Sequence, residues 1–293
     1  MNPEPRFRFC AIADCHFSKK TALADQVLID DLNKLEADYT LVLGDISGQP
    51  GAGGPEMTRR AVELLRGLRM PWRNVIGNHD LEYEPIQTDR ENVVLWLRAH
   101  EYRLPWHRED RGPFTFLFLS TERFRENEIQ PHEVYLTRRQ LAWADDELKR
   151  CAHRPVVVAC HAPVLGSNLV VHPELHVRAG NAYVNQNHTP GQIMDLCCRH
   201  KNILFWFSGH SHLSQAHANA IVNTAGIHFV HTGTTSADWT REIKRHSRVV
   251  DVEPERVVIR TFDHDKRALD PALDFVIPHS LEHLLAARHA RAK

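Results

Sequence analysis

The stretch FRFCAIADCH, residues 7–16, places two polar side chains, Asp14 and His16, directly after an apolar run. The run FRFCAI is typical of a buried β-strand, and the polar residues follow at its carboxyl end. In open α/β folds, ligands bind in the crevice beyond the carboxyl ends of the strands. The stretch therefore predicts an α/β fold with a functional site at the end of its first strand.

Four further polar clusters repeat this arrangement after the apolar runs TLVL, RNVI, PVVVAC and ILFWFS. They are Gly44-Asp45, Gly77-Asn78-His79-Asp80, His161 and Gly209-His210-Ser211-His212. Aligned strands bring such ends to one edge of a sheet. Imidazole, carboxylate and amide groups suit zinc, manganese or iron, and the clusters lack the thiolates of a closed structural zinc site. Together they predict a site for two metal ions.

The weight of this prediction comes from the set and not from any single cluster. A lone histidine in a chain with 21 of them is more often structural than a ligand. Gly77-Asn78-His79-Asp80 is more telling, because a glycine followed by three polar side chains is a poor way to build a core. All five clusters lie at strand ends, and together they offer enough ligands for two metals.

The composition is that of an ordinary globular protein. The chain has 293 residues, of which 42% are apolar and 25% are charged, and no change in composition divides it. We therefore expect a single domain over residues 1–265, followed by a C-terminal extension at 266–293 with a short helix.

The charge, the N-terminal sequence and the cysteines indicate which kinds of partner and which cellular compartment to expect. The formal net charge is -1, so no general basic field favours nucleic acid or a membrane surface. The N-terminal sequence lacks the apolar stretch of a secretory signal. Six cysteines without paired spacing are typical of buried free thiols in a reducing compartment. The sequence predicts a cytoplasmic protein and leaves room for a homo-oligomer.

Apolar runs and amphipathic stretches alternate through most of the chain. Strands are expected at 6–13, 40–43, 73–76, 114–119, 156–160 and 203–208. Helices are expected at 21–36, 56–69, 87–99, 137–150 and 190–200. This alternation predicts a largely parallel sheet. The later runs GIHFVHTG, RVVDV and RVVIRTF predict strands without intervening helices, in a second, partly antiparallel sheet packed on the first.

Two segments are expected to be loops near the site. The glycine-rich segment 49–55 directly follows Asp45, and the segment 163–189 is longer than an ordinary connection. The longer segment carries polar residues that we consider as substrate contacts, although for any one of them a solvated loop position is the better explanation. These residues are Asn168, His172, His176, Arg178, Asn181, Tyr183, Asn185, Asn187 and His188.

Taken in order, the five clusters resemble the motif series of the calcineurin-like metallophosphoesterase superfamily. The resemblance implies a four-layer α/β/β/α sandwich of two mixed sheets flanked by helices, with the metals at the strand ends. Gly48 stands where purple acid phosphatases have a tyrosine, and the Asp-Arg-Gly extension of protein Ser/Thr phosphatases is missing. The chain is most similar to class III cyclic nucleotide phosphodiesterases and related broad-specificity phosphodiesterases.

The resemblance also implies a role for each motif residue. One metal is assigned to Asp14, His16, Asp45 and His212, and the second to Asp45, Asn78, His161 and His210. Asp45 then bridges the two metals, while Asn78 and His79 contact the substrate. His79 is the catalytic acid near the leaving group. Asp80 joins it in the catalytic set, either orienting His79 or capping the turn.

The chemistry expected of such a site is phosphoester hydrolysis. Two divalent ions and the carboxylates Asp14 and Asp45 leave a residual charge of about +2, which attracts a phosphate ester. We expect a metal-bound hydroxide to attack a phosphodiester, cyclic nucleotides included, while His79 protonates the leaving oxygen. A phosphomonoesterase or a nucleotide pyrophosphatase with the same metal core is the alternative. A noncatalytic scaffold and a nuclease are further alternatives.

Overall fold

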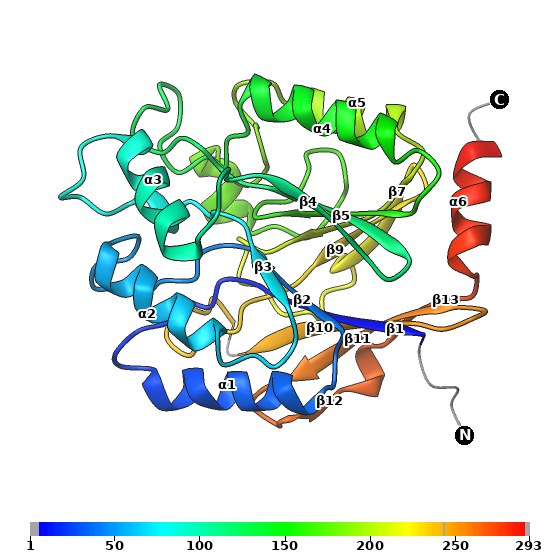
Figure 1. Ribbon diagram of the computed structural model, residues 1–293, viewed down its shortest axis with the longest axis horizontal. Coiled ribbons are helices and arrows are strands. Elements are labelled where there is room, and N and C mark those ends of the chain that lie inside the picture. Colours follow the sequence, from blue (N-terminus) through cyan, green and yellow to red (C-terminus); the bar gives the residue numbers. More distant parts are fainter. Residues whose placement is uncertain (1–5, 243, 291–293) are drawn as a thin grey trace.

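The computed structural model describes residues 6–242 and 244–290 and folds them into two β-sheets stacked face to face (Figure 1). Helices cover the outer face of each sheet, so the predicted α/β/β/α order of layers is confirmed. The first sheet has the strand order β12-β11-β10-β1-β2-β3, with β13 paired to β11, and the second has the order β4-β5-β6-β7-β9-β8.

The first sheet is built around β1, which pairs in parallel with β2 and antiparallel with β10. Strand β3 extends the parallel part, and β11 forms a hairpin with β10. The strands are β1 (Phe7–Ile12), β2 (Tyr39–Val42), β3 (Trp72–Asn74), β10 (His246–Val252), β11 (Val257–Asp263), β12 (Ala268–Leu269) and β13 (Phe275–Ile277). The parallel strands end at one edge, which fixes where their following residues lie.

The second sheet has a parallel centre and antiparallel edges. Strands β5, β6, β7 and β9 run in parallel, while β4 and β8 pair antiparallel at the two sides. The strands are β4 (His107–Arg111), β5 (Phe114–Leu119), β6 (Val156–Cys160), β7 (Ile203–Ser208), β8 (Ile221–Thr224) and β9 (Ile227–His231). Crossover helices link β5 to β6 and β6 to β7, as parallel pairing requires.

The helices divide between the two outer faces. Helices α1 and α2 pack on the first sheet, and α4 and α5 pack on the second (Figure 1). Helix α3 lies beside α2, and α6 packs Leu284 and Leu285 against the core between the sheets. The helices are α1 (Ala22–Lys34), α2 (Pro55–Leu65), α3 (Asp89–His100), α4 (Arg138–Arg150), α5 (Gln192–Arg199) and α6 (Leu281–Ala290).

Aromatic side chains fill the space between the two sheets. Phe9 of β1 packs edge-on against Phe116 of β5 and Phe207 of β7, each with ring centroids 5.5 Å apart. Cys10 and Ile12 point to the opposite face of β1 and pack under the helices of the first sheet. Because both faces of β1 are buried, its sequence is a nearly continuous apolar run. Each buried phenylalanine contributes about 1.5–3 kcal/mol to folding.

Every strand and helix expected between residues 6 and 208 is present, with ends shifted by a few residues. The expected division of strands between the sheets was wrong. The strands before residue 208 belong to both sheets, and the late hairpin β10–β11 extends the first sheet. Periodicity shows that a strand forms but does not identify its neighbour. The edge strands β4 and β8 were missed because HREDR and IVNT have no apolar run.

All six cysteines are free, and all but Cys198 are buried, as their spacing predicts. The described helices include none that is both long enough and apolar enough to cross a membrane.

Candidate metal centre

The residues predicted as metal ligands meet at one edge of the sandwich. Asp14 and His16 follow β1, Asp45 follows β2, His161 follows β6, and the pair His210 and His212 follows β7. Asn78 lies in the turn after β3. All of these side chains are buried, with no more than 6% of any residue exposed. Burying so many polar groups in one place is costly unless they are paired or bind a cation.

Six of these residues form two groups. Asp14, His16 and His212 make up the first group, and Asp45, His161 and His210 make up the second. Within each group the possible ligand atoms all lie within 4.8 Å of one another. The division agrees with the one that the family resemblance implies, and the roles of these residues as ligands stay a prediction.

The second group gathers lone pairs around His161 Nε2. Asp45 Oδ2 and Asn78 Oδ1 each lie 3.1 Å from this nitrogen, and His210 Nδ1 lies 3.2 Å from it. His161 Nδ1 donates to the carbonyl of Leu43 at 2.6 Å, so Nε2 carries the lone pair of the neutral ring. His210 Nε2 donates to the carbonyl of Asn181 at 2.7 Å, which leaves Nδ1 as its ligand atom.

The first group shows the same arrangement. His212 Nε2 lies 3.1 Å from Asp14 Oδ1 and 3.3 Å from His16 Nε2. His212 Nδ1 donates to the carbonyl of Trp239 at 2.6 Å, so Nε2 again carries the lone pair. Backbone carbonyls thus fix the tautomers of His161, His210 and His212, as they do for metal-binding histidines. Asp45 Oδ2 is buried without a hydrogen-bond partner among the described residues, and this donor set fits two divalent cations.

The backbone at the site is unusual. Asp14, His16, Asp45, His210 and His212 all have left-handed φ angles, between 43° and 70°. Such a conformation costs a non-glycine residue about 1–3 kcal/mol and persists only where the surroundings impose it. It also directs His210 and His212 into different groups, whereas in an extended chain residues two apart point the same way.

Glycines in the motifs let the carboxylates approach the backbone. A Cβ atom at Gly77 would lie 2.1 Å from Asp45 Oδ1, and one at Gly209 would lie 2.3 Å from Asp14 Oδ2. Asp45 Oδ1 accepts from the amide of His79 at 2.8 Å, and Asp14 Oδ2 accepts from the amide of His210 at 2.8 Å. Each aspartate therefore has one oxygen held by backbone and the other directed at its group of ligand atoms.

The two aspartates are ionised. Burial opposes ionisation of Asp14, but the imidazoles of His212 and His161 together outweigh burial and lower the pKa of that carboxyl to about 2. Burial likewise opposes ionisation of Asp45, but His161, His79 and His16 together outweigh burial and bring the pKa of Asp45 well below its usual range. Both side chains are thus in the charge state that metal binding requires.

The imidazoles divide into two kinds. Burial, with His212 beside it, lowers the pKa of His16 to about 3, and burial with His176 brings the pKa of His210 well below its usual range. These rings are neutral, as ligands must be. Burial would also lower the pKa of His161, but the Asp45 carboxylate outweighs burial and raises it to about 10. A proton on His161 therefore competes with a metal ion for Nε2.

His79 and Asp80 lie at the site but have different surroundings. His79 lines the cavity, and its Nδ1 lies 2.6 Å from Glu82 Oε2. The Asp80 carboxylate is buried and accepts from the amides of Asp45, Ile46 and Gly77 at 2.9–3.1 Å. Asp80 therefore binds the turn backbone, whereas Glu82 is the residue that contacts the His79 ring, and the catalytic role expected of Asp80 stays a prediction.

A cavity of about 410 Å³ opens over the two groups. Two of the polar residues considered in the 163–189 segment, His176 and Asn181, line it. Others from that segment point elsewhere: Arg178 pairs with Glu174 on the surface, and Asn185 binds the backbone of Leu136.

Several residues of the cavity were not foreseen from the sequence. The Trp239 ring packs 4.8 Å from the His16 ring and 5.0 Å from the His79 ring. Arg241 and His132 also line the cavity. None of these residues directly follows an apolar strand, so the pattern that identified the ligands does not identify them. The run SADWTR at 236–241, an exposed tryptophan close to an arginine, was the available signal.

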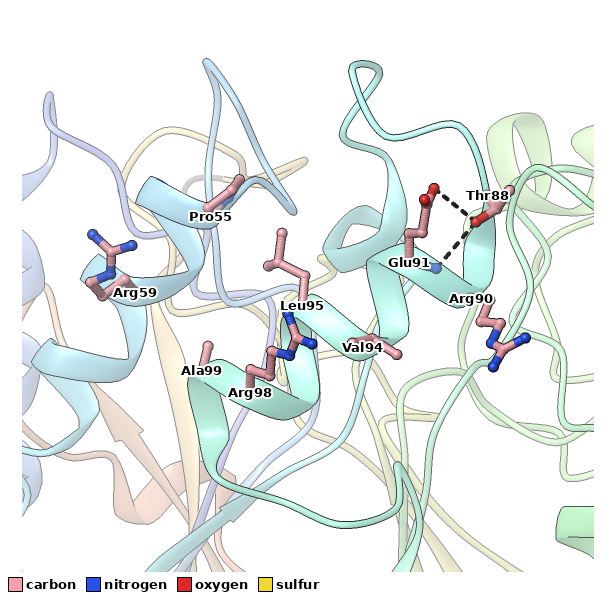
Figure 2. Close-up of a pocket in the computed structure, with 9 residues that line it drawn as sticks. All are labelled: Pro55, Arg59, Thr88, Arg90, Glu91, Val94, Leu95, Arg98 and Ala99. Atoms are coloured by element: carbon pink, nitrogen blue, oxygen red, sulfur yellow. Dashed lines mark hydrogen bonds between the residues drawn. The ribbon is translucent and has the colours of Figure 1, made fainter.

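A larger cavity, of about 900 Å³, lies between α2 and α3 (Figure 2). Arg59 projects from α2, and Arg90 and Arg98 project from α3, around an apolar strip that includes Val94 and Leu95. None of the candidate metal ligands lines this groove.

Three solved structures have similar folds. A dimetal phosphatase from Danio rerio matches with a TM-score of 0.67 and 15% identity, over 94% of this chain and 100% of its own. A purple acid phosphatase from yellow lupin (Lupinus luteus) seeds matches with a TM-score of 0.64 and 12% identity, over 97% of this chain and 56% of its own. GAP50, the anchor in the inner membrane complex of Plasmodium, matches with a TM-score of 0.61 and 11% identity, over 97% of this chain and 94% of its own.

At these identities the structural matches concern the fold. The family is given by the sequence, which matches the calcineurin-like phosphoesterases over residues 7–214. The chain therefore belongs to the calcineurin-like phosphoesterase family, with candidate ligands for two metals at its strand ends. No curated protein sequence matches it.

Proposed function

We propose that this protein is a two-metal phosphodiesterase, nearest within its family to class III cyclic nucleotide and broad-specificity phosphodiesterases. The observation that carries the proposal is the convergence of buried lone pairs from Asp14, His16 and His212 beside those from Asp45, His161 and His210. Carboxylates and imidazoles that face one another at 3.1–3.3 Å in a buried site are suited to bound cations.

The metals would be held by the predicted ligands. Asp14, His16 and His212 would hold one ion, and Asn78, His161 and His210 the other, with Asp45 between them. Manganese, iron and zinc all suit this nitrogen and oxygen set. When bound, the pair would supply Lewis acidity toward the phosphoryl oxygens and activate the attacking water.

His79 would act as the general acid. Glu82 accepts from Nδ1 of His79, which leaves Nε2 as the nitrogen that serves the substrate. A proton at Nε2 would pass to the leaving oxygen as its bond to phosphorus breaks. Trp239 and Glu82 hold the ring from two sides, and the amide of His79 is tied to Asp45. The acid is thus fixed relative to the ligand that would bridge the metals.

The substrate would be a small phosphorylated molecule, cyclic nucleotides included. A phosphomonoesterase or nucleotide pyrophosphatase would use the same residues. The free cysteines suit a reducing compartment, and we propose that the protein is cytoplasmic.

The test is metal analysis of the purified protein together with turnover of two model substrates. We expect two equivalents of metal, and faster hydrolysis of bis(p-nitrophenyl) phosphate than of p-nitrophenyl phosphate with manganese added. Dominant monoesterase activity would overturn the phosphodiesterase assignment. Absence of bound metal after reconstitution would overturn the two-metal site itself.

A further inference from the structure

The cavity over the metal centre contains a cation that the proposed reaction does not use. The guanidinium of Arg241 lies with Nη2 3.1 Å from His176 Nε2. The His176 ring stacks on His210, with ring centroids 4.6 Å apart at 29°. Arg241 therefore lies one ring beyond a ligand of the second group, too far out to take the place of that ligand.

Arg241 has no carboxylate partner among residues 6–242 and 244–290. An arginine guanidinium only donates hydrogen bonds, so His176 Nε2 accepts from it and the proton of the neutral ring is on Nδ1. That Nδ1 atom is buried and has no hydrogen-bond partner in the described chain. Apart from Asp45, the carboxylate in the cavity lining is that of Asp238, an exposed residue. The cavity thus presents a cation and an unused donor side by side.

A guanidinium of this kind is suited to a phosphate group. Its planar set of donors matches two phosphate oxygens at once, and such charge-assisted pairs are stronger than neutral hydrogen bonds. The two metals would already accommodate the phosphoryl group that reacts. A cavity of about 410 Å³ has room for a nucleotide-sized molecule in addition to that group.

We propose that Arg241 and His176 form a second anion subsite, which binds a phosphate group of the substrate other than the one that reacts. Among the small phosphorylated substrates of the proposed function, the preferred one is then an organic molecule with two phosphate groups. This inference rests on the proposed function, because it takes the metal centre as the place of reaction. Arg241 is a specificity-determining residue, and His176 positions its guanidinium.

The test uses a matched pair of substrates that differ by one phosphate group. They are thymidine 5′-(p-nitrophenyl phosphate) and the same compound with a 3′-phosphate. In both, water adds to the 5′-phosphorus, the bond to the aryl oxygen breaks and p-nitrophenolate leaves. In the metal-loaded wild type, we expect the 3′-phosphate to raise kcat/KM by about 10- to 100-fold, as a charge-assisted hydrogen bond would.

The substitution Arg241→Ala should reduce that gain to less than about twofold, and Arg241→Lys should retain part of it because it keeps the charge without the planar donor set. Arg90→Ala, in the separate groove of Figure 2, should leave the gain unchanged. No gain in the wild type, or an equal loss of kcat/KM for both substrates in Arg241→Ala, would overturn the proposal.

A binding experiment separates this inference from the proposed function. Calorimetry would compare thymidine 3′,5′-bisphosphate with thymidine 5′-monophosphate in the metal-loaded protein. A preference of the wild type for the bisphosphate, if Arg241→Ala abolishes it, supports the subsite even when neither nitrophenyl ester is hydrolysed. The absence of hydrolysis would instead overturn the proposed function. Equal binding of the two ligands by the wild type would overturn the subsite even if both esters are hydrolysed.

Discussion

The two cavities of this protein differ in whether their polar groups have hydrogen-bond partners, and their volumes do not show this difference. The groove between α2 and α3 is the larger, at about 900 Å³ against about 410 Å³ over the strand ends. In the groove, Glu91 and Thr88 satisfy each other as a helix cap, and the arginines are exposed to solvent (Figure 2). Over the strand ends, Asp45 Oδ2 and His176 Nδ1 are buried and have no hydrogen-bond partner among the residues that the structure describes.

Backbone conformation separates the two regions as well. The groove is lined mainly by residues of two regular helices, whereas the strand-end site holds Asp14, Asp45 and His210 in left-handed conformations. Strain and unpaired buried polar groups both oppose folding, so they persist where a bound ligand compensates or selection for activity maintains them. The difference favours the smaller cavity as the place of the proposed reaction and gives no reason to assign the groove a part in it.

The largest expected effect is that of removing the residue shared by both predicted metal shells. Asp45→Ala should reduce metal content and lower turnover to less than about one-thousandth, because losing a single electrostatic stabiliser already costs roughly 10²–10³. Metal analysis and the rate with bis(p-nitrophenyl) phosphate would measure it. The matched control is Glu91→Gln in the groove, which also removes a carboxylate. Full metal content in the Asp45 variant would contradict the assigned ligand set.

Substitution of the proposed acid should separate catalysis from metal binding. His79→Gln should lower kcat by about 10²–10⁴, the usual contribution of a general acid, while both metals stay bound. The side chain of His79 reaches Glu82 and the cavity, and it is not in either group of ligand candidates. Metal analysis beside steady-state kinetics would measure both properties. Turnover equal to that of the wild type would exclude His79 as the acid.

A smaller effect is expected from the residue that orients this acid. Glu82→Ala frees Nδ1 of His79 and should lower kcat by about 10-fold or somewhat more, as substitutions in an outer shell typically do. Glu82→Gln keeps an acceptor oxygen and should lose less. Glu84→Ala, an exposed neighbour, is the control. If Glu84→Ala and Glu82→Ala reduced kcat equally, the loss would reflect the loop and not the orientation of the ring.

The sequence was sufficient to predict the layers and the strand ends that carry the candidate ligands. Buried strands such as β1 need apolar residues on both faces, and this requirement is visible in FRFCAI. The division into two sheets was not predictable in the same way. Strand β10 pairs with β1 across more than 200 residues of chain, and nothing in its own periodicity indicates that partner.

The sequence predicted only those residues of the site that directly follow a strand. Asp14 and His210 follow apolar runs, so topology brings them together. Glu82, Trp239 and Arg241 come from loops, where position depends on local contacts such as the hydrogen bond from His212 Nδ1 to the carbonyl of Trp239. These contacts have no periodic signature, and for that reason Trp239 and Arg241 were missed, although His176, which contacts Arg241, was among the polar residues considered in the 163–189 segment.

The smallest effect is expected in the groove, and it tests the comparison most directly. Arg98→Ala and Arg59→Ala should leave kcat/KM within about twofold of the wild type and change stability by no more than about 0.5 kcal/mol, as exposed substitutions usually do. Neither side chain has a hydrogen bond or ion pair with the described residues that its loss would break. Kinetics with bis(p-nitrophenyl) phosphate would measure kcat/KM, and thermal unfolding would measure stability. A tenfold loss of kcat/KM in either variant would place the groove on the path of the substrate, because no contact of these arginines reaches the strand-end site.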